Sequence, residues 1–262
     1  MKTYRSIFCV ALTALSPLVM GTYAFAQVAP APSEQALDYD EIPNVAPAAP
    51  AIEDMDFDQR HEACLESIND DPEIAFEEAM IWQSRGGGRR ARHCAALALF
   101  AAGETRMAAA QLEQMGSETR IGPSGMRAEF YAQAADFWLV GQDPRAAYRA
   151  ANSGLEIAKS DTDLRIIRAR AYAKLGRWDY AEIDLTSTLA YDPVNVQALI
   201  YRADARRRQG KLDEGLADAE RALALDELSV EAAVVRGDIR EEMRLAKVES
   251  ETSIQRPQPA TE

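Results

Sequence analysis

Two histidines and two of the three cysteines are the residues of this chain whose types and spacing could do chemistry. His61 stands three residues before Cys64, a spacing that places both side chains on one face of a helix. His93 and Cys94 are adjacent, and neighbouring side chains on a helix point about 100° apart. The four residues therefore fit a shared zinc ion poorly. A redox or metal-responsive module built on them is an alternative interpretation.

Other chemistry is not indicated by the sequence. Catalysis needs a nucleophile, a base that titrates near neutral pH or a metal with an open position, and the chain has only those two histidines. The stretch GGGRR at 86–90 follows a predicted helix and not a strand, so a flexible connector is a better interpretation than a phosphate-binding loop. We predict no enzymatic activity, no cofactor and no metal site.

The N-terminus has the parts of a secretory signal peptide. Lys2 and Arg5 precede an apolar run over 7–20, and Ala-Phe-Ala at 24–26 predicts cleavage before Gln27. The apolar run is shorter than the about 20 residues that cross a bilayer; a retained membrane anchor is the alternative. A composition rich in alanine and arginine is typical of GC-rich bacterial genomes, so we expect export to the periplasm.

The rest of the chain divides by composition. Loss of Lys2 and Arg5 would lower the net charge from −13 to −15, and such a charge repels nucleic-acid phosphates and anionic lipids. We therefore predict no nucleic-acid partner and no stable membrane insertion after cleavage. Prolines, alanines and acids over 27–56 predict a disordered tether, and 248–262 is predicted to be a disordered tail. We expect the folded domain over 57–247.

The folded part repeats itself at an interval of 34 residues. Arg168, Ala169, Ala171, Gly176, Leu189 and Asp192 recur identically as Arg202, Ala203, Ala205, Gly210, Leu223 and Asp226. A glycine can end a helix in the left-handed conformation, and alanines allow two helices to approach closely. Few residues favour strands, so each unit is predicted to be a hairpin of two helices of about 12 to 16 residues.

These units resemble tetratricopeptide repeats. Residues 162–195 match that family's pattern of small, aromatic, glycine and proline positions with Ala169, Tyr172, Gly176, Trp178, Ala181 and Pro193. In the next unit, Arg206 replaces the aromatic residue and Glu227 the proline, while the preceding unit fits with one residue inserted after Gly141. The resemblance implies an all-α, right-handed α-solenoid of about five hairpins, with a closing helix from 230 to 247.

The resemblance also bears on the cysteines that remain after Cys9 leaves with the signal peptide. Cys64 and Cys94 fall on the expected first helices of neighbouring units, which lie side by side in repeats of this kind. An even number of cysteines in an exported chain favours a disulfide. We predict a structural Cys64–Cys94 bond, with a pair of buried free thiols as the alternative.

In this family the first helices line a concave groove. Carrying its groove positions onto this chain gives Tyr131, Trp138, Ile166, Arg170, Lys174, Ile200, Asp204, Arg207 and Arg208. This set suggests an apolar floor with a basic rim, which suits a peptide with apolar anchors and a carboxylate. The family's lysine and asparagine carboxylate clamp is not reproduced, since Ile166 and Arg170 occupy its positions. Binding of chaperone-type C-terminal tails is therefore not expected.

Together these patterns predict a non-catalytic scaffold or adaptor in the periplasm that holds a protein or peptide partner in its groove. An accessory subunit of a cell-envelope enzyme is a further alternative that the sequence does not separate from the first.

Overall fold

The computed structural model describes residues 56–118 and 122–254, which form eleven α-helices and no strand. In chain order the helices are α1 (Phe57–Asp70), α2 (Pro72–Ser84), α3 (Gly88–Ala101), α4 (Thr105–Ser117), α5 (Ser124–Val140), α6 (Pro144–Ile157), α7 (Thr162–Lys174), α8 (Trp178–Tyr191), α9 (Val196–Arg208), α10 (Leu212–Leu225) and α11 (Val230–Ile254). The predicted signal peptide, its cleavage site before Gln27 and all but the last residue of the predicted tether lie outside the described residues.

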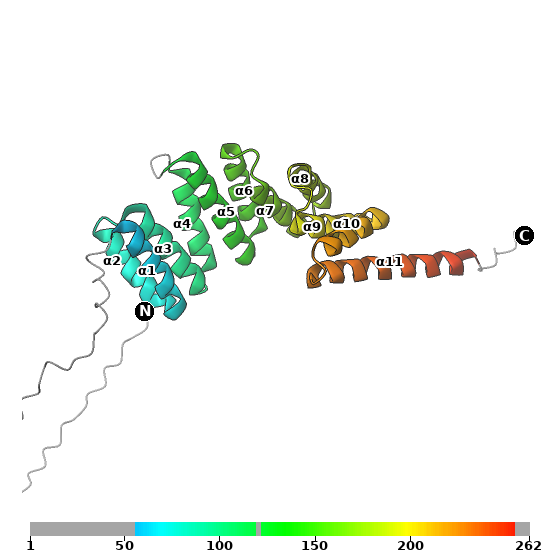
Figure 1. The fold of residues 1–262 in the computed structure, drawn as a ribbon, viewed down its shortest axis with the longest axis horizontal. Coiled ribbons are helices and arrows are strands. Elements are labelled where there is room, and N and C mark those ends of the chain that lie inside the picture. Colours follow the sequence, from blue (N-terminus) through cyan, green and yellow to red (C-terminus); the bar gives the residue numbers. More distant parts are fainter. Residues whose placement is uncertain (1–55, 119–121, 255–262) are drawn as a thin grey trace, which may run out of the picture. The chain divides into compact units, whose positions relative to one another are not determined.

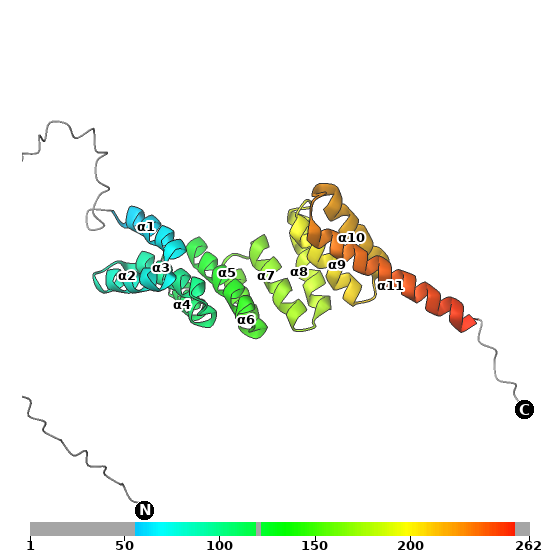
Figure 2. The same ribbon diagram turned by 90° about the horizontal axis from the view of Figure 1, so that it is seen from below.

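The helices pair in the order of the chain. α1 with α2, α3 with α4, α5 with α6, α7 with α8 and α9 with α10 form five hairpins, and each helix also packs against the next (Figure 1, Figure 2). α11 packs against α10 and α9 and closes the series. The expectation of five hairpins and a closing helix is confirmed.

Short polar side chains begin several of these helices. The carboxylate of Asp71 accepts hydrogen bonds from the backbone N–H groups of Glu73 and Ile74, and the side chain of Asn195 accepts one from Ala198. Such caps satisfy amides that have no partner inside the helix.

The turns within four of the hairpins contain one residue with a positive φ. It is Gly103 between α3 and α4, Gly176 between α7 and α8, and Gly210 between α9 and α10, with φ values of 90°, 72° and 76°. Between α5 and α6 this residue is Gln142, with φ 60°, and not the preceding Gly141. Because Gln142 stands 34 positions before Gly176, this hairpin is in register, and the predicted insertion after Gly141 is wrong.

Two large hydrophobic clusters form most of the core, and α7 contributes to both. Leu164, Ile167 and Ala171 pack in the cluster built from α3 to α7. Ile166 and Ala169, on another face of the same helix, pack in the cluster built from α7 to α11. α7 therefore joins two apolar cores.

The repeated arginines seen in the sequence form ion pairs within hairpins. Arg168 of α7 donates from Nε and Nη2 to both carboxylate oxygens of Asp184 in α8, at 2.8 and 2.7 Å. Arg202 of α9 donates in the same way to Asp218 of α10, at the same distances. Both aspartates are only 5% exposed, so each pair satisfies charges that would be costly to bury alone.

The closing helix is longer than expected. α11 continues to Ile254, beyond the boundary predicted at residue 247, and no glycine or proline stands between residues 247 and 254. Its last turns extend past α9 and α10 (Figure 2). None of the helices in the described ranges has both the length and the apolar character needed to span a bilayer.

Candidate functional site

A hollow of about 430 Å³ lies between α7, α8 and α9, and we call it the groove pocket. Its floor is apolar and consists of Ala169, Ala173, Ala181 and Leu185. Trp178 and Tyr201 form aromatic walls. The small alanine side chains leave this space open, since no large residue fills the gap between the helices.

The rim of the groove pocket is mostly cationic. Arg170, Lys174 and Arg208 line it together with a single acid, Asp204. Arg208 lies over the ring of Trp178, with its guanidinium carbon 5.5 Å from the ring centroid. Its Nε lies 3.8 Å from a carboxylate oxygen of Asp204. Lys174 is exposed and has no ion-pair partner among the described residues. It is therefore the rim cation whose charge is most available to a ligand.

A second hollow of about 500 Å³ adjoins the first. It lies across α5, α7 and α9, and both hollows are lined by Arg170 and Tyr201. Arg170 donates to Asp136 of α5 at 2.5 Å and lies 5.9 Å from the ring centroid of Tyr201. Ile166 contributes apolar surface here, although the residue is only 8% exposed. The two hollows form one path over the first helices of three hairpins.

Five of the predicted groove residues line these hollows: Ile166, Arg170, Lys174, Asp204 and Arg208. Arg207 does not, because its side chain is 10% exposed and binds Asp204 and Glu242 at 2.7 and 2.5 Å. Its role is to tie α9 to α11.

Three further predictions are corrected by the structure. Ile200 is only 3% exposed and belongs to the core, where it packs in the same cluster as residues of α11. Tyr131 packs in the other core cluster, and a Cβ added at Gly116 would lie 2.9 Å from its ring. Trp138 donates from its indole nitrogen to Glu113 of α4 at 3.0 Å, so it faces the preceding hairpin and not the groove.

Sequence reasoning missed several residues that line the path. The largest are Trp178 and Tyr201. For α9, Ile200 was predicted in place of its neighbour Tyr201, and Asp136 and Gln133 of α5 were also missed. Asp136 stands 34 residues before Arg170, so the repeat interval would have found it if Gln142 had been recognised as the turn residue.

A third hollow, of about 230 Å³, lies where α1, α3 and α5 meet. Gln133 lines it and also the second hollow, so the polar path continues toward α1. With both imidazoles neutral, Nε2 of His93 donates to Gln133 at 2.9 Å, and its Nδ1 accepts from Nε2 of His61 at 3.1 Å. Burial lowers the pKa of His61, and neighbouring His93 and Arg90 lower it further. Burial also lowers the pKa of His93, against the raising effect of the hydrogen bond with Gln133.

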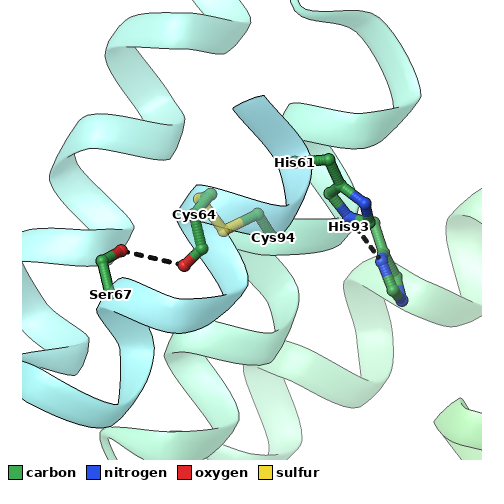
Figure 3. Close-up of a disulfide and its surroundings, with 5 residues drawn as sticks. All are labelled: His61, Cys64, Ser67, His93 and Cys94. Carbon is green, nitrogen blue, oxygen red and sulfur yellow. Dashed lines mark hydrogen bonds between the residues drawn. A yellow bond between two sulfur atoms is a disulfide. The ribbon is translucent and has the colours of Figure 1, made fainter. Parts of the chain in front are cut away.

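The two cysteines form a disulfide next to this histidine pair. It joins Cys64 of α1 to Cys94 of α3, with 6.3 Å between the Cα atoms (Figure 3). These are the first helices of neighbouring hairpins, as predicted. No group of three or more histidine, cysteine, aspartate or glutamate side chains in the described ranges is arranged to hold a metal ion. Since both thiols are oxidised here, they offer no thiolate ligand.

Comparison with known proteins identifies the fold. No protein-family model matches the sequence, and no curated protein matches it. The crystal structure of YrrB, described as a TPR protein with an unusual peptide-binding site, aligns with a TM-score of 0.55 at 15% sequence identity. The alignment covers 69% of this chain and 90% of YrrB. The chain has a tetratricopeptide-repeat fold.

Two smaller TPR domains are similar to part of this chain. The second TPR domain of human RPAP3, solved in complex with an HSP70 peptide, has a TM-score of 0.43 at 24% identity, covering 45% of this chain and 98% of that domain. The TPR domain of Arabidopsis OM64 has a TM-score of 0.45 at 22% identity, covering 46% of this chain and 99% of that domain.

Proposed function

We propose that this protein is a non-catalytic interaction module that binds an extended peptide segment of a partner protein along α5, α7 and α9. The observation that carries the proposal is the groove pocket, which combines an apolar floor, two aromatic walls and a cationic rim. Apolar pockets with a few placed polar groups are the usual form of a recognition site. The peptide-binding site named in the description of YrrB is consistent with this use of the fold.

The lining defines the chemistry of the peptide. An apolar side chain would fill the space over Ala169, Ala181 and Leu185. A carboxylate next to it, from an acidic side chain or a C-terminus, would pair with Lys174 and Arg208. Toward α5 the path is lined by Asp136 and Asp163, so that end favours neutral or basic residues. The ligand would therefore lie in one direction, with its acidic end near Lys174.

We further propose that the protein works as an adaptor in the periplasm, reached by export and cleavage before Gln27. The signal-peptide pattern supports this location, and a Cys64–Cys94 disulfide fits an oxidising compartment. N-terminal sequencing of the protein purified from fractionated cells tests it, with Gln27 as the expected first residue. A protein that begins at Met1 in the cytoplasmic fraction would contradict it.

Photo-crosslinking in intact cells tests the groove. Tyr201→p-benzoylphenylalanine places a crosslinker in both hollows, and Ile183→p-benzoylphenylalanine is the control on the outer surface of α8, where Ile183 is 60% exposed. We expect partner adducts at position 201 and few at 183. Adding Lys174→Glu and Arg208→Glu should remove the adducts while helicity by circular dichroism stays unchanged. Equal amounts of partner adduct at positions 201 and 183 would refute binding of the partner in the groove pocket. Adducts that persist with Lys174→Glu and Arg208→Glu would refute it as well.

A second candidate function is favoured by one observation. α1 contains no buried residue, so its attachment depends strongly on the disulfide with α3. A redox-responsive module would use this bond to hold or release α1, and the exchange experiment on the cysteine variant described below tests that release.

A further inference from the structure

Two arginines of α9 hold the second helix of their hairpin. Arg202 makes the two hydrogen bonds with Asp218 of α10 described above, and Arg206 adds a third from Nη1 at 2.8 Å. The aspartate stands three residues after Gly215, which lies so close to α9 that an added Cβ would be 3.0 Å from the carbonyl oxygen of Ala203. Two features thus hold α9 and α10 together: close backbone approach at Gly215, and the hydrogen bonds of Arg202 and Arg206 to Asp218.

α11 repeats this arrangement one interval later. Arg202 and Arg206 correspond to Arg236 and Arg240, and Ala203 corresponds to Gly237, each 34 positions further along the chain. α11 is therefore built as the first helix of another hairpin, although the described residues contain no helix after it.

The surface that would receive a second helix is uncovered. We call the surface of Ala233, Arg236, Gly237 and Arg240 the open face of α11. A Cβ added at Gly237 would meet nothing within 4 Å. Arg236 has no hydrogen-bond or ion-pair partner among the described residues, and Arg240 makes one exposed ion pair, with Glu220 at 2.8 Å. α11 therefore has the two arginines, Arg236 and Arg240, but no described residue takes the place that Asp218 of α10 has beside Arg202 and Arg206.

Two pairs of exposed apolar residues lie on the side of α11 next to the open face, with Glu241 between the pairs. Val230, Val234, Leu245 and Val248 are 76%, 56%, 51% and 47% exposed, and their spacing places them along one side of α11. A terminal helix that only shields the core from water would have polar residues there. The exposed pair Val230 and Val234, which lies alongside the open face, is a second observation that points to a covering partner.

We propose that the open face of α11 binds an α-helix of another protein that carries an aspartate three residues after a small residue. α8 and α10 show the pattern, with Ala181 before Asp184 and Gly215 before Asp218. In a second copy of this chain both of these helices are already buried in their own hairpins, so neither is free to dock. The cationic open face favours an acidic helix, and this surface is separate from the groove.

A synthetic peptide tests the open face directly. The probe is the helix that covers α9, residues 211–226, acetylated, amidated and labelled with fluorescein, and its binding to the full chain is followed by fluorescence anisotropy. We expect saturable binding, weakened about tenfold or more by Asp218→Asn in the peptide or by Arg236→Ala in the protein, because a charged hydrogen-bonded pair is lost. No saturable binding, or binding unaffected by Arg236→Ala, would overturn the proposal.

Two further variants separate docking from folding. Gly237→Leu should abolish peptide binding by blocking close approach, yet keep the native helicity, since its side chain enters open space. Lys174→Glu, in the groove pocket, should leave peptide binding unchanged. Sedimentation of the wild type gives the remaining outcome: self-association that Gly237→Leu abolishes would assign the open face to a second copy and overturn the proposal as stated.

Discussion

The first two hairpins and the fourth and fifth hairpins are held together by different means. In α7 to α10, buried alanines and the repeated arginine–aspartate pairs join successive helices. In α1 to α3 the cluster of buried residues that α1 packs against is small, with Ala79, Cys94 and Ala95 at its centre, and α1 itself has no buried residue. The attachment of α1 includes the disulfide, the histidine pair and an ion pair between Arg90 and Asp58. Where the repeat residues are missing, a covalent bond replaces what packing supplies elsewhere.

Removing the disulfide is the strongest way to break this contrast. Cys64→Ala with Cys94→Ala should destabilise the N-terminal hairpins by about 3 to 4 kcal/mol, since the bond closes a loop with a sequence separation of 30. Hydrogen exchange followed by mass spectrometry should show rapid exchange in α1 and unchanged protection in α7 to α10. Reduction of the wild type is the matched control and should give the same pattern. Unchanged exchange in α1 would show that packing alone holds it.

The second test weakens the C-terminal hairpins. Asp218→Ala should cost about 3 kcal/mol and Asp184→Ala somewhat less. The first change leaves Arg202 without its carboxylate and removes one of the carboxylates that bind Arg206, which keeps Glu182, whereas the second change affects only Arg168. Urea unfolding measures both. Asp213→Ala, at an exposed position of α10, is the control and should change the free energy of unfolding by about 0.5 kcal/mol or less. Equal losses in the free energy of unfolding for the three variants would show that the arginine–aspartate pairs do not stabilise these hairpins.

The third test concerns the hairpin between these regions. Gln142→Gly should raise the free energy of unfolding by about 0.5 to 1 kcal/mol, because a left-handed φ of 60° suits glycine better than glutamine. Gly176→Gln is the reciprocal change and should lower stability by a similar amount. Thermal unfolding measures both. A loss of stability in Gln142→Gly would mean that the glutamine side chain contributes more than its backbone costs.

The smallest expected effect is a difference between the two regions in how their stability depends on pH. The pKa values of His61 and His93 are lowered in the folded state, so their contribution to stability is complete above the unfolded value of about 6.5 and is lost as the pH falls below it. In the other region, burial raises the pKa of Glu182, but hydrogen bonds from Lys211, Arg206 and Gln209 lower it by more. The pKa of Glu182 is therefore about 2 in the folded protein. That contribution is present above about pH 4.5 and is lost only as the pH falls toward 2.

Hydrogen exchange at about pH 7.5 and about pH 5.5, corrected for the intrinsic rate, tests this difference. Protection of α1 should fall at the lower pH while protection of α8 and α9 stays constant. His61→Asn should reduce the change in α1. Equal loss of protection in both regions would contradict the assignment to the histidines.

The sequence predicted the helices and their pairing well because the repeat interval is a property of the chain itself. Identities from Arg168 to Asp226 placed the last two hairpins, and the turn glycines marked their ends. The disulfide was also predicted, since its cysteines fall on first helices of adjacent units.

The candidate site was predicted less completely, and the reasons are physical. Taking Gly141 as the turn residue moved the assignment on α5 by one position, which turns a helix by about 100°. Tyr131 and Trp138 were therefore assigned to the groove, whereas Ala132 and Asp136 line it. Arg207 was missed as a structural residue because its partners on α11, Asp238 and Glu242, lie more than 30 residues away in the sequence.

The participation of α7 in both hydrophobic clusters has a mechanical consequence. When the chain is stretched from its ends, we expect it to unfold in steps. One cluster can unfold while the other stays folded, until α7 detaches from the remaining cluster. A ligand bound to Arg170 would contact α7, the helix shared by the two clusters. It should therefore raise the force needed for the step in which α7 detaches and leave the other steps unchanged.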